Sequence, residues 1–246
     1  MAIISVTPDD ITARLDEIGP GTEVVLQPGR YRQVLRWAGK QGRADAPIVP
    51  RGEPGAVITD ETSAEDFRRK GNELAKSVED RGKYPGLYPW MLEGRLKLER
   101  CRHVRIEGLT FEKSWPTHVA LFDCQDIVLA GCNFIDGTFA IGAEGAATYG
   151  ITIEGCDWTQ DRPAHRLWQE IPWWRVHGRF EDGRPSVDLV NDWRLFDGDF
   201  FRGDGIRGGV TIKDCRVSQA FNAIHLFNSE GKAELALDVT CTAAGS

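Results

Sequence analysis

The sequence has little of what several common classes of protein require. Its 246 residues contain no apolar run longer than a few residues, so no segment is expected to span a bilayer as a helix. Basic residues are outnumbered by acidic ones, with 30 Lys and Arg against 37 Asp and Glu. The resulting net charge of −7 argues against nucleic acid as a partner. The fingerprints of P-loops, dinucleotide-binding folds and serine hydrolases are also absent. Residues 1–5 lack the basic start of a signal peptide, so we expect a cytosolic chain or one from which a leader was removed.

Methionine is scarce, with 2 residues, whereas glycine is frequent, with 27. Few long helix-forming side chains and many glycines favour a fold rich in strands and turns. The 41% of hydrophobic residues can form a core, and the length fits one large all-β domain spanning residues 1–246. Two counts are left to explain, namely 8 Trp and an even number of 6 Cys, which invites a disulfide interpretation.

The first 60 residues predict one helix and two strands. Residues 7–18 predict a short amphipathic helix with Thr7 as its N-cap, because apolar residues follow at helical spacing. Strands are expected at 23–26 and 56–58, each beside a Pro-Gly turn. Residues 61–90 then break the strand pattern, which predicts a helical insertion on the side of the β body.

An internal repeat dominates the rest of the chain. Four segments align in the sequence: 104–111, 127–134, 151–158 and 210–217. A period of 22–24 residues is typical of leucine-rich repeats or of a parallel β-helix. Each repeat here contains short strand-like runs and no helical half, so we interpret it as one coil of a β-solenoid. The last offset exceeds one period because of a second insertion, which we place at about 160–207.

These repeats, with the opening pattern 19–31 and the segment 52–58, resemble the right-handed parallel β-helix (pectate-lyase-like) superfamily. The resemblance implies an all-β fold, a right-handed parallel β-helix with an N-terminal capping helix and the two side insertions. It also implies β-elimination on a uronic-acid polymer, in which a base removes the C5 proton and a cation or metal neutralises the carboxylate. No catalytic motif of the superfamily maps onto this sequence.

The repeat gives the cysteines positions. Two vertical ladders are expected, one of Cys132, Cys156 and Cys215 and one of Cys101 and Cys124. We predict buried thiols that act as small apolar side chains, rather than disulfides or metal ligands, because no CxxC or nearby His pair exists. Likewise Phe111, Phe134 and Trp158 are expected to form an internal aromatic stack.

The first candidate for chemistry is a histidine on the outer surface. The alignment places His225 in one outward column with Lys97, Ala120 and Gly142, so that small neighbours leave a depression beside it. A histidine there suits a general base near neutral pH, and the alternative is a solvated surface residue.

The second candidate is the insertion at 160–207, which concentrates tryptophan with Arg and His. Tryptophan faces stack on sugar rings and Arg binds carboxylates, so this lobe suits an anionic glycan, unless its tryptophans only hold it to the coil. The substrate-binding candidates are Trp168, Trp173, Trp174, Arg175, His177 and, three residues before His225, Asn222.

The third candidate is the acidic segment 197–207. Asp197 and Asp199 suit a Ca²⁺ site, and its carboxylates, including Asp204, suit the acid and base of a glycosidase. Arg207 would bind a substrate carboxylate. Alternatively, the Asp residues serve turns or structural ion pairs.

The leading functional hypothesis is a polysaccharide lyase acting on an acidic polysaccharide, with His225, Arg207 and Asp204 as catalytic candidates. A glycoside hydrolase or a non-enzymatic glycan-binding β-helix are the alternatives. No capping element follows the last strand at 235–241, which predicts a homodimer through this end or a longer β-helix of which this chain is the N-terminal part. Neither nucleic acid nor membrane is expected as a partner.

Overall fold

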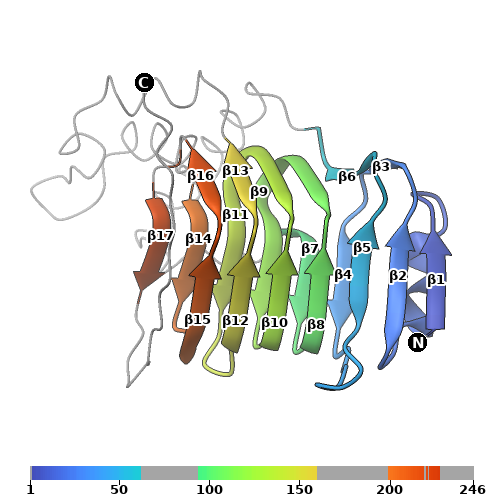
Figure 1. Ribbon diagram of the computed structural model, residues 1–246, viewed down its shortest axis with the longest axis horizontal. Helices are drawn as coiled ribbons and strands as arrows, with labels where there is room; N and C mark the ends of the chain where they lie inside the picture. Colours follow the sequence, from blue (N-terminus) through green and yellow to red (C-terminus); the bar gives the residue numbers. More distant parts are fainter. Residues whose placement is uncertain (1, 62–93, 160–198, 219, 221, 228–246) are drawn as a thin grey trace, which may run out of the picture.

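The protein is a parallel β-helix in the computed structural model (Figure 1), which describes residues 2–61, 94–159, 199–218, 220 and 222–227. The strands of successive coils pair in parallel and build three faces, which we name A, B and C. The expected all-β parallel β-helix is therefore confirmed. The one helix of the described residues is short, and none of them forms a helix able to cross a membrane.

Face A lies toward the viewer in Figure 1 and contains seven strands: β1 (Ala2–Val6), β2 (Thr22–Leu26), β5 (Val49–Gly52), β8 (Arg102–Glu107), β10 (Gln125–Ala130), β12 (Tyr149–Glu154) and β15 (Gly208–Lys213). Faces B and C share two long bent strands, β9 (Thr110–Phe122) and β11 (Asn133–Glu144). Face B adds β3 (Gly29–Tyr31), β6 (Ala56–Thr59), β13 (Asp157–Thr159) and β16 (Arg216–Ser218). Face C adds β4 (Leu35–Ala38), β7 (Gly94–Glu99), β14 (Asp199–Asp204) and β17 (Asn222–Phe227).

The register confirms the sequence repeat. Val104, Ile127, Ile151 and Val210 are partners in successive strands of face A. The corner from face A to face B turns on a left-handed residue, which is Gly131 or Gly155 at φ 60°. Glycine adopts this conformation without the steric cost of a Cβ atom, which explains part of the glycine excess.

The N-terminal helix differs from the prediction. It is a 3₁₀ helix, η1 (Ile11–Glu17), and Thr7 is not its N-cap. The Asp10 side chain accepts a hydrogen bond from the Thr7 amide at 2.6 Å, and this turn delays the helix. Its apolar side still packs against the core, because Ile11 and Ile18 are buried.

The interior contains the expected ladders. All five cysteines of the described residues are buried and free, which confirms their role as small apolar side chains. The thiols also donate to carbonyls of the preceding coil, as from Cys124 to Leu98 at 3.3 Å. Phe111 and Phe134 stack with ring centroids 5.1 Å apart, and Trp158 follows Phe134 in register.

Residues 199–204, which the sequence places in the second insertion, form β14 and belong to the coil. This strand pairs with β11 on one side and β17 on the other. Residues 160–198 of that insertion, residues 62–90 of the first one, and the final strand expected at 235–241 lie outside the described residues.

Candidate functional site

The outer side of face C carries the predicted histidine column. Its members, in coil order, are Arg36, Lys97, Ala120, Gly142, Arg202 and His225. The register thus places His225 with Lys97, Ala120 and Gly142 as the repeat predicts. It also inserts Arg202 directly beside the histidine, between it and Gly142.

Arg202 and His225 share a carboxylate at the start of β14. Nη1 of Arg202 lies 3.3 Å from Oδ2 of Asp199, and Nδ1 of His225 lies 3.4 Å from the same oxygen. The Arg202 and Asp199 side chains are 1% and 0% exposed, whereas that of His225 is 32% exposed. The guanidinium of Arg202 lies over the ring of Phe139, 5.0 Å from its centre. A buried ion pair therefore supports a histidine that reaches solvent.

A second column on face C, two residues further along each strand, contains carboxylates. Glu144 of β11 is in register with Asp204 of β14. Burial, with the negative charges of Asp204 and Asp123, raises the pKa of Glu144 to about 7. Two neighbouring carboxylates with one raised pKa can divide the roles of proton donor and proton acceptor near neutral pH.

The same column is neutralised at its N-terminal end. Glu99 faces Nη2 of Arg36 at 2.6 Å and Nζ of Lys97 at 3.2 Å. Burial disfavours the Glu99 carboxylate, but the hydrogen bonds from Arg36 and Lys97 outweigh this effect and lower its pKa. The chemistry of the face thus changes along the axis, from a neutralised carboxylate to one that holds its proton.

The other predicted residues are placed less closely. Asp204 is 8% exposed and lies beside Glu144. Arg207 follows β14 in the turn toward face A, where its guanidinium lies 5.5 Å from the centre of the Tyr149 ring. The backbone of Asn222 pairs with Asp199. Six predicted residues lie outside the described residues: Trp168, Trp173, Trp174, Arg175, His177 and Asp197.

The carboxylate of Asp199 faces two nitrogen groups, the guanidinium of Arg202 and the imidazole of His225. The Ca²⁺ site expected at Asp197 and Asp199 stays a prediction, because Asp197 lies outside the described residues. Within the described ranges, no three His, Cys, Asp or Glu side chains are grouped to hold a metal ion.

Sequence reasoning missed Glu144 and the position of Arg202. Both follow from the register, since Glu144 lies two residues beyond Gly142, and Arg202 lies between Gly142 and His225. Aligning β14 with β11 is the signal that would have found them.

No family model and no curated protein matches this chain. Among solved structures, it is similar to a mannuronic acid specific polysaccharide family 6 lyase from human gut microbiota, with 15% identity, a TM-score of 0.49, and coverage of 92% of this chain and 51% of that one. It is also similar to an alginate lyase from Paenibacillus sp., with 13% identity, a TM-score of 0.39, and coverage of 99% and 94%. The pectin methylesterase from Aspergillus niger gives 9% identity, a TM-score of 0.38, and coverage of 100% and 86%.

The chain thus spans about half the length of the first of these proteins. At such identities a likeness concerns the fold alone, and one fold hosts many activities. What defines this chain as a parallel β-helix protein is its own strand register across three parallel faces. The candidate catalytic groups lie on face C.

Proposed function

We propose that this chain is an enzyme that cleaves an acidic, uronate-containing polysaccharide by β-elimination on face C. The observation that carries the proposal is the cluster of Asp199, Arg202 and His225. Burying an ion pair costs desolvation free energy that a purely structural contact rarely returns, and such groups cluster at catalytic sites. Here the buried pair lies directly behind a histidine that is partly exposed.

His225 is the base of the proposed reaction. The carboxylate of Asp199 lies next to Nδ1 and favours the tautomer that has its proton there, which leaves the lone pair on Nε2. Nε2 takes the C5 proton of the uronate, and the C–H electron pair forms the C4–C5 double bond. The C4–O4 bond breaks as this double bond forms.

Glu144 is the acid of the proposed reaction. With a pKa of about 7, a large fraction of this carboxyl group is protonated near neutral pH. It donates its proton to the leaving O4, so the proton removed from C5 is balanced by one delivered to the product. Before the next turnover, His225 releases the proton it has taken to solvent, and Glu144 takes up a proton from solvent.

The carboxylate of the uronate needs a positive charge, because neutralising it acidifies the adjacent C5 proton. Arg175, which the sequence favours for this role, is the proposed source of this charge. Arg207 is a weaker candidate, since its guanidinium lies over Tyr149 at the corner toward face A.

A glycoside hydrolase is the second candidate, and the pair of Glu144 and Asp204 favours it. A neighbouring carboxylate helps to keep Glu144 protonated, which is the arrangement that a hydrolase needs in its acid and base. In this alternative, water attacks the anomeric carbon and no double bond forms.

The test is to incubate the protein with polymannuronate, polyguluronate and polygalacturonate and to follow absorbance in the near ultraviolet. We expect an unsaturated product from at least one polymer, and about a hundredfold or greater loss of kcat in His225→Ala. Arg216→Ala, which removes an exposed side chain on face B, is the matched control and should retain activity. Reducing ends without absorbance would instead identify the hydrolase, and unchanged activity in His225→Ala would refute the assigned base.

A further inference from the structure

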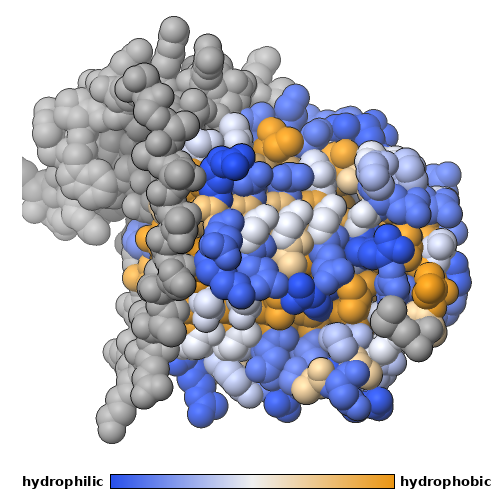
Figure 2. Space-filling model, in the orientation of Figure 1, coloured by the Kyte–Doolittle hydropathy of each residue, from blue (hydrophilic) through white to orange (hydrophobic). Residues whose placement is uncertain are grey.

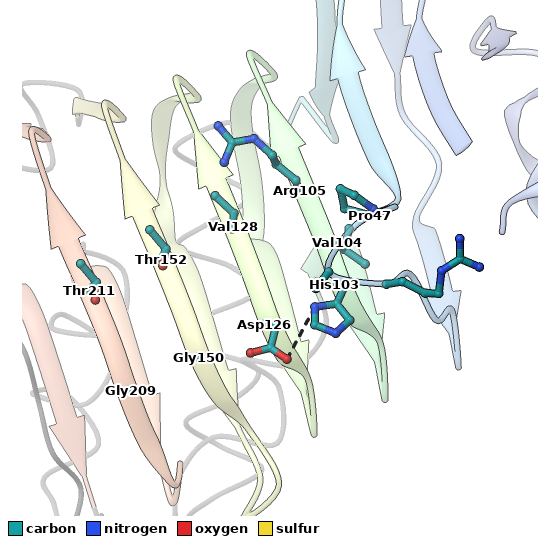
Figure 3. A pocket seen from close by; sticks show the side chains of 12 residues that line it. Pro47, His103, Val104, Arg105, Asp126, Val128, Gly150, Thr152, Gly209 and Thr211 are labelled. Atoms are coloured by element: carbon teal, nitrogen blue, oxygen red, sulfur yellow. Dashed lines mark ion pairs between the residues drawn. The ribbon is translucent and has the colours of Figure 1, made fainter. Parts of the chain in front are cut away.

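The outer side of face A has a groove of about 550 Å³ that crosses successive coils. In Figure 2 this side shows pale, near-neutral residues with hydrophilic side chains, in blue, around them. Figure 3 shows two parallel rows in the groove: Thr211, Thr152, Val128 and Arg105 in one, and Gly209, Gly150, Asp126 and His103 in the other. The groove is thus built from equivalent positions of four coils.

Coil geometry gives the groove a regular spacing. Neighbouring strands of a sheet lie about 4.8 Å apart. This is similar to the spacing of successive rings in an extended, 1,4-linked sugar polymer. A polymer lying along the coil axis would therefore meet one equivalent pair of positions for each ring.

Glycine keeps one end of the groove open. Gly150 has a φ of 71°, and a Cβ atom there would come within 2.8 Å of Oδ1 of Asp126. Gly209 has a φ of 68°, and a Cβ atom there would lie 3.2 Å from the Gly150 amide nitrogen. Side chains at either position would therefore crowd the groove.

Polar side chains occupy the equivalent positions at the other end, at a conformational cost. His103 and Asp126 have φ values of 49° and 54°, a left-handed conformation that costs a residue with a Cβ atom about 1 kcal/mol. Glycine would relieve this cost, as it does in the next two coils. The two side chains face each other in the groove, with Nδ1 of His103 lying 3.6 Å from Oδ2 of Asp126 (Figure 3), so both can present polar groups to a ligand.

The lining is more positive than the protein as a whole. Two guanidinium groups, of Arg43 and Arg105, line it against one carboxylate, Asp126. Carboxylates outside the lining also pair with both guanidinium groups: Arg105 pairs with Glu107 and, at 3.0 Å, with Glu154, and Arg43 pairs with Asp45 at 3.2 Å. The lining residues themselves carry one net positive charge in a chain of net charge −7, which favours an anionic ligand.

We propose that this groove binds an acidic oligosaccharide as a second, non-catalytic site. Arg43 and Arg105 would bind uronate carboxylates, and the hydroxyl groups of Thr152 and Thr211 would hydrogen-bond to sugar hydroxyls. The ligand class rests on the proposed function, whereas the groove does not. Because the groove and the cluster of Asp199, Arg202 and His225 lie on different faces, one long polymer bound at face A raises the concentration of its neighbouring segments near face C.

The test measures binding by titration calorimetry in the His225→Ala background, which prevents turnover. The probes are hexamers of mannuronate and galacturonate, with a neutral cellohexaose for comparison. Thr152→Glu adds a negative charge to the groove, and Thr110→Glu makes the same change at an outward position of face B. We expect two bound acidic hexamers per chain, with affinity at the groove falling about tenfold or more in Thr152→Glu but not in Thr110→Glu.

Equal binding by Thr152→Glu and Thr110→Glu would overturn the inference, and so would cellohexaose binding as tightly as the acidic hexamers. The proposed function fails separately. Absence of any unsaturated product, with acidic binding still lost in Thr152→Glu, would leave the groove assigned and remove the lyase. Formation of unsaturated product, with binding insensitive to Thr152→Glu, would support the lyase and reject the second binding site on face A.

Discussion

Faces A and C are built from the same coils but hold their charges in opposite ways. On face A, Nζ of Lys213 lies 2.9 Å from Oε2 of Glu154, with side chains 43% and 25% exposed. On face C, Nη1 of Arg202 lies 3.3 Å from Oδ2 of Asp199, with side chains 1% and 0% exposed. The first pair is solvated and joins two neighbouring strands, whereas the second is buried and lies within the single strand β14.

An exposed ion pair is an ordinary surface contact, whereas a buried ion pair indicates a functional site. Exposed ion pairs contribute from nothing to about 1 kcal/mol, because solvent screens them and side-chain entropy opposes them. A buried pair is costly to form and costlier to break, so its presence needs a reason beyond stability. On face C the proposed catalytic role of His225, which faces the same carboxylate, supplies that reason.

The largest effect is expected from breaking the buried pair. Asp199→Ala removes the carboxylate that faces Arg202 and His225, and we expect it to lower the free energy of unfolding by about 3 kcal/mol. Urea denaturation followed by circular dichroism measures this loss. If Asp199→Ala unfolded at the same urea concentration as the wild type, Asp199 and Arg202 would not form a buried ion pair.

A smaller effect, dependent on pH, is expected from Glu144. Its pKa of about 7 lies above the ordinary value of 4.5, so the folded state keeps a proton that the unfolded state releases. Stability should therefore fall as pH rises from about 4.5 to about 7 and stay constant above. Glu144→Gln removes this dependence and should be more stable than the wild type at pH 8, by about 1 to 2 kcal/mol after allowance for partial exposure.

Glu99→Gln is the matched comparison on the same face. The pKa of Glu99 is lowered, since hydrogen bonds from Arg36 and Lys97 outweigh its burial. The ionised group therefore contributes stability above its unfolded pKa, and this contribution is lost as the pH falls. Glu99→Gln should be less stable than the wild type at pH 8. If Glu99→Gln and Glu144→Gln were both more stable or both less stable than the wild type, the assigned pKa shifts would be contradicted.

The smallest effect is expected on face A. Glu154→Gln weakens the exposed pairs with Arg105 and Lys213, so the urea midpoint should move only slightly and the shift should shrink further in high salt. A loss as large as that of Asp199→Ala would remove the contrast between the two faces.

The sequence predicts the coil well because the coil repeats. Alternating apolar residues and the cysteine ladders recur at one period, so aligning Cys132 with Cys156 also fixes the strands around them. The same register places His225 in one outward column with Gly142, and Arg202 lies between them.

The features that the sequence does not predict depend on contacts between residues on either side of the second insertion. Asp204 follows Glu144 by 60 residues, yet it lies beside it and helps to raise its pKa. The acidic segment around Asp199 resembles a turn in composition, and only its pairing with β11 shows that it is a strand. Burial of Asp199 and Arg202 likewise belongs to the folded arrangement rather than to any local pattern.

The measurement that tests the proposed function most directly compares two signals from one digestion of a polyuronate. Near-ultraviolet absorbance counts double bonds, and a reducing-end assay counts cleaved glycosidic bonds. The proposed β-elimination predicts one double bond for every new reducing end, with both signals lost in His225→Ala. Reducing ends that accumulate without absorbance, or cleavage that persists in His225→Ala, would contradict it.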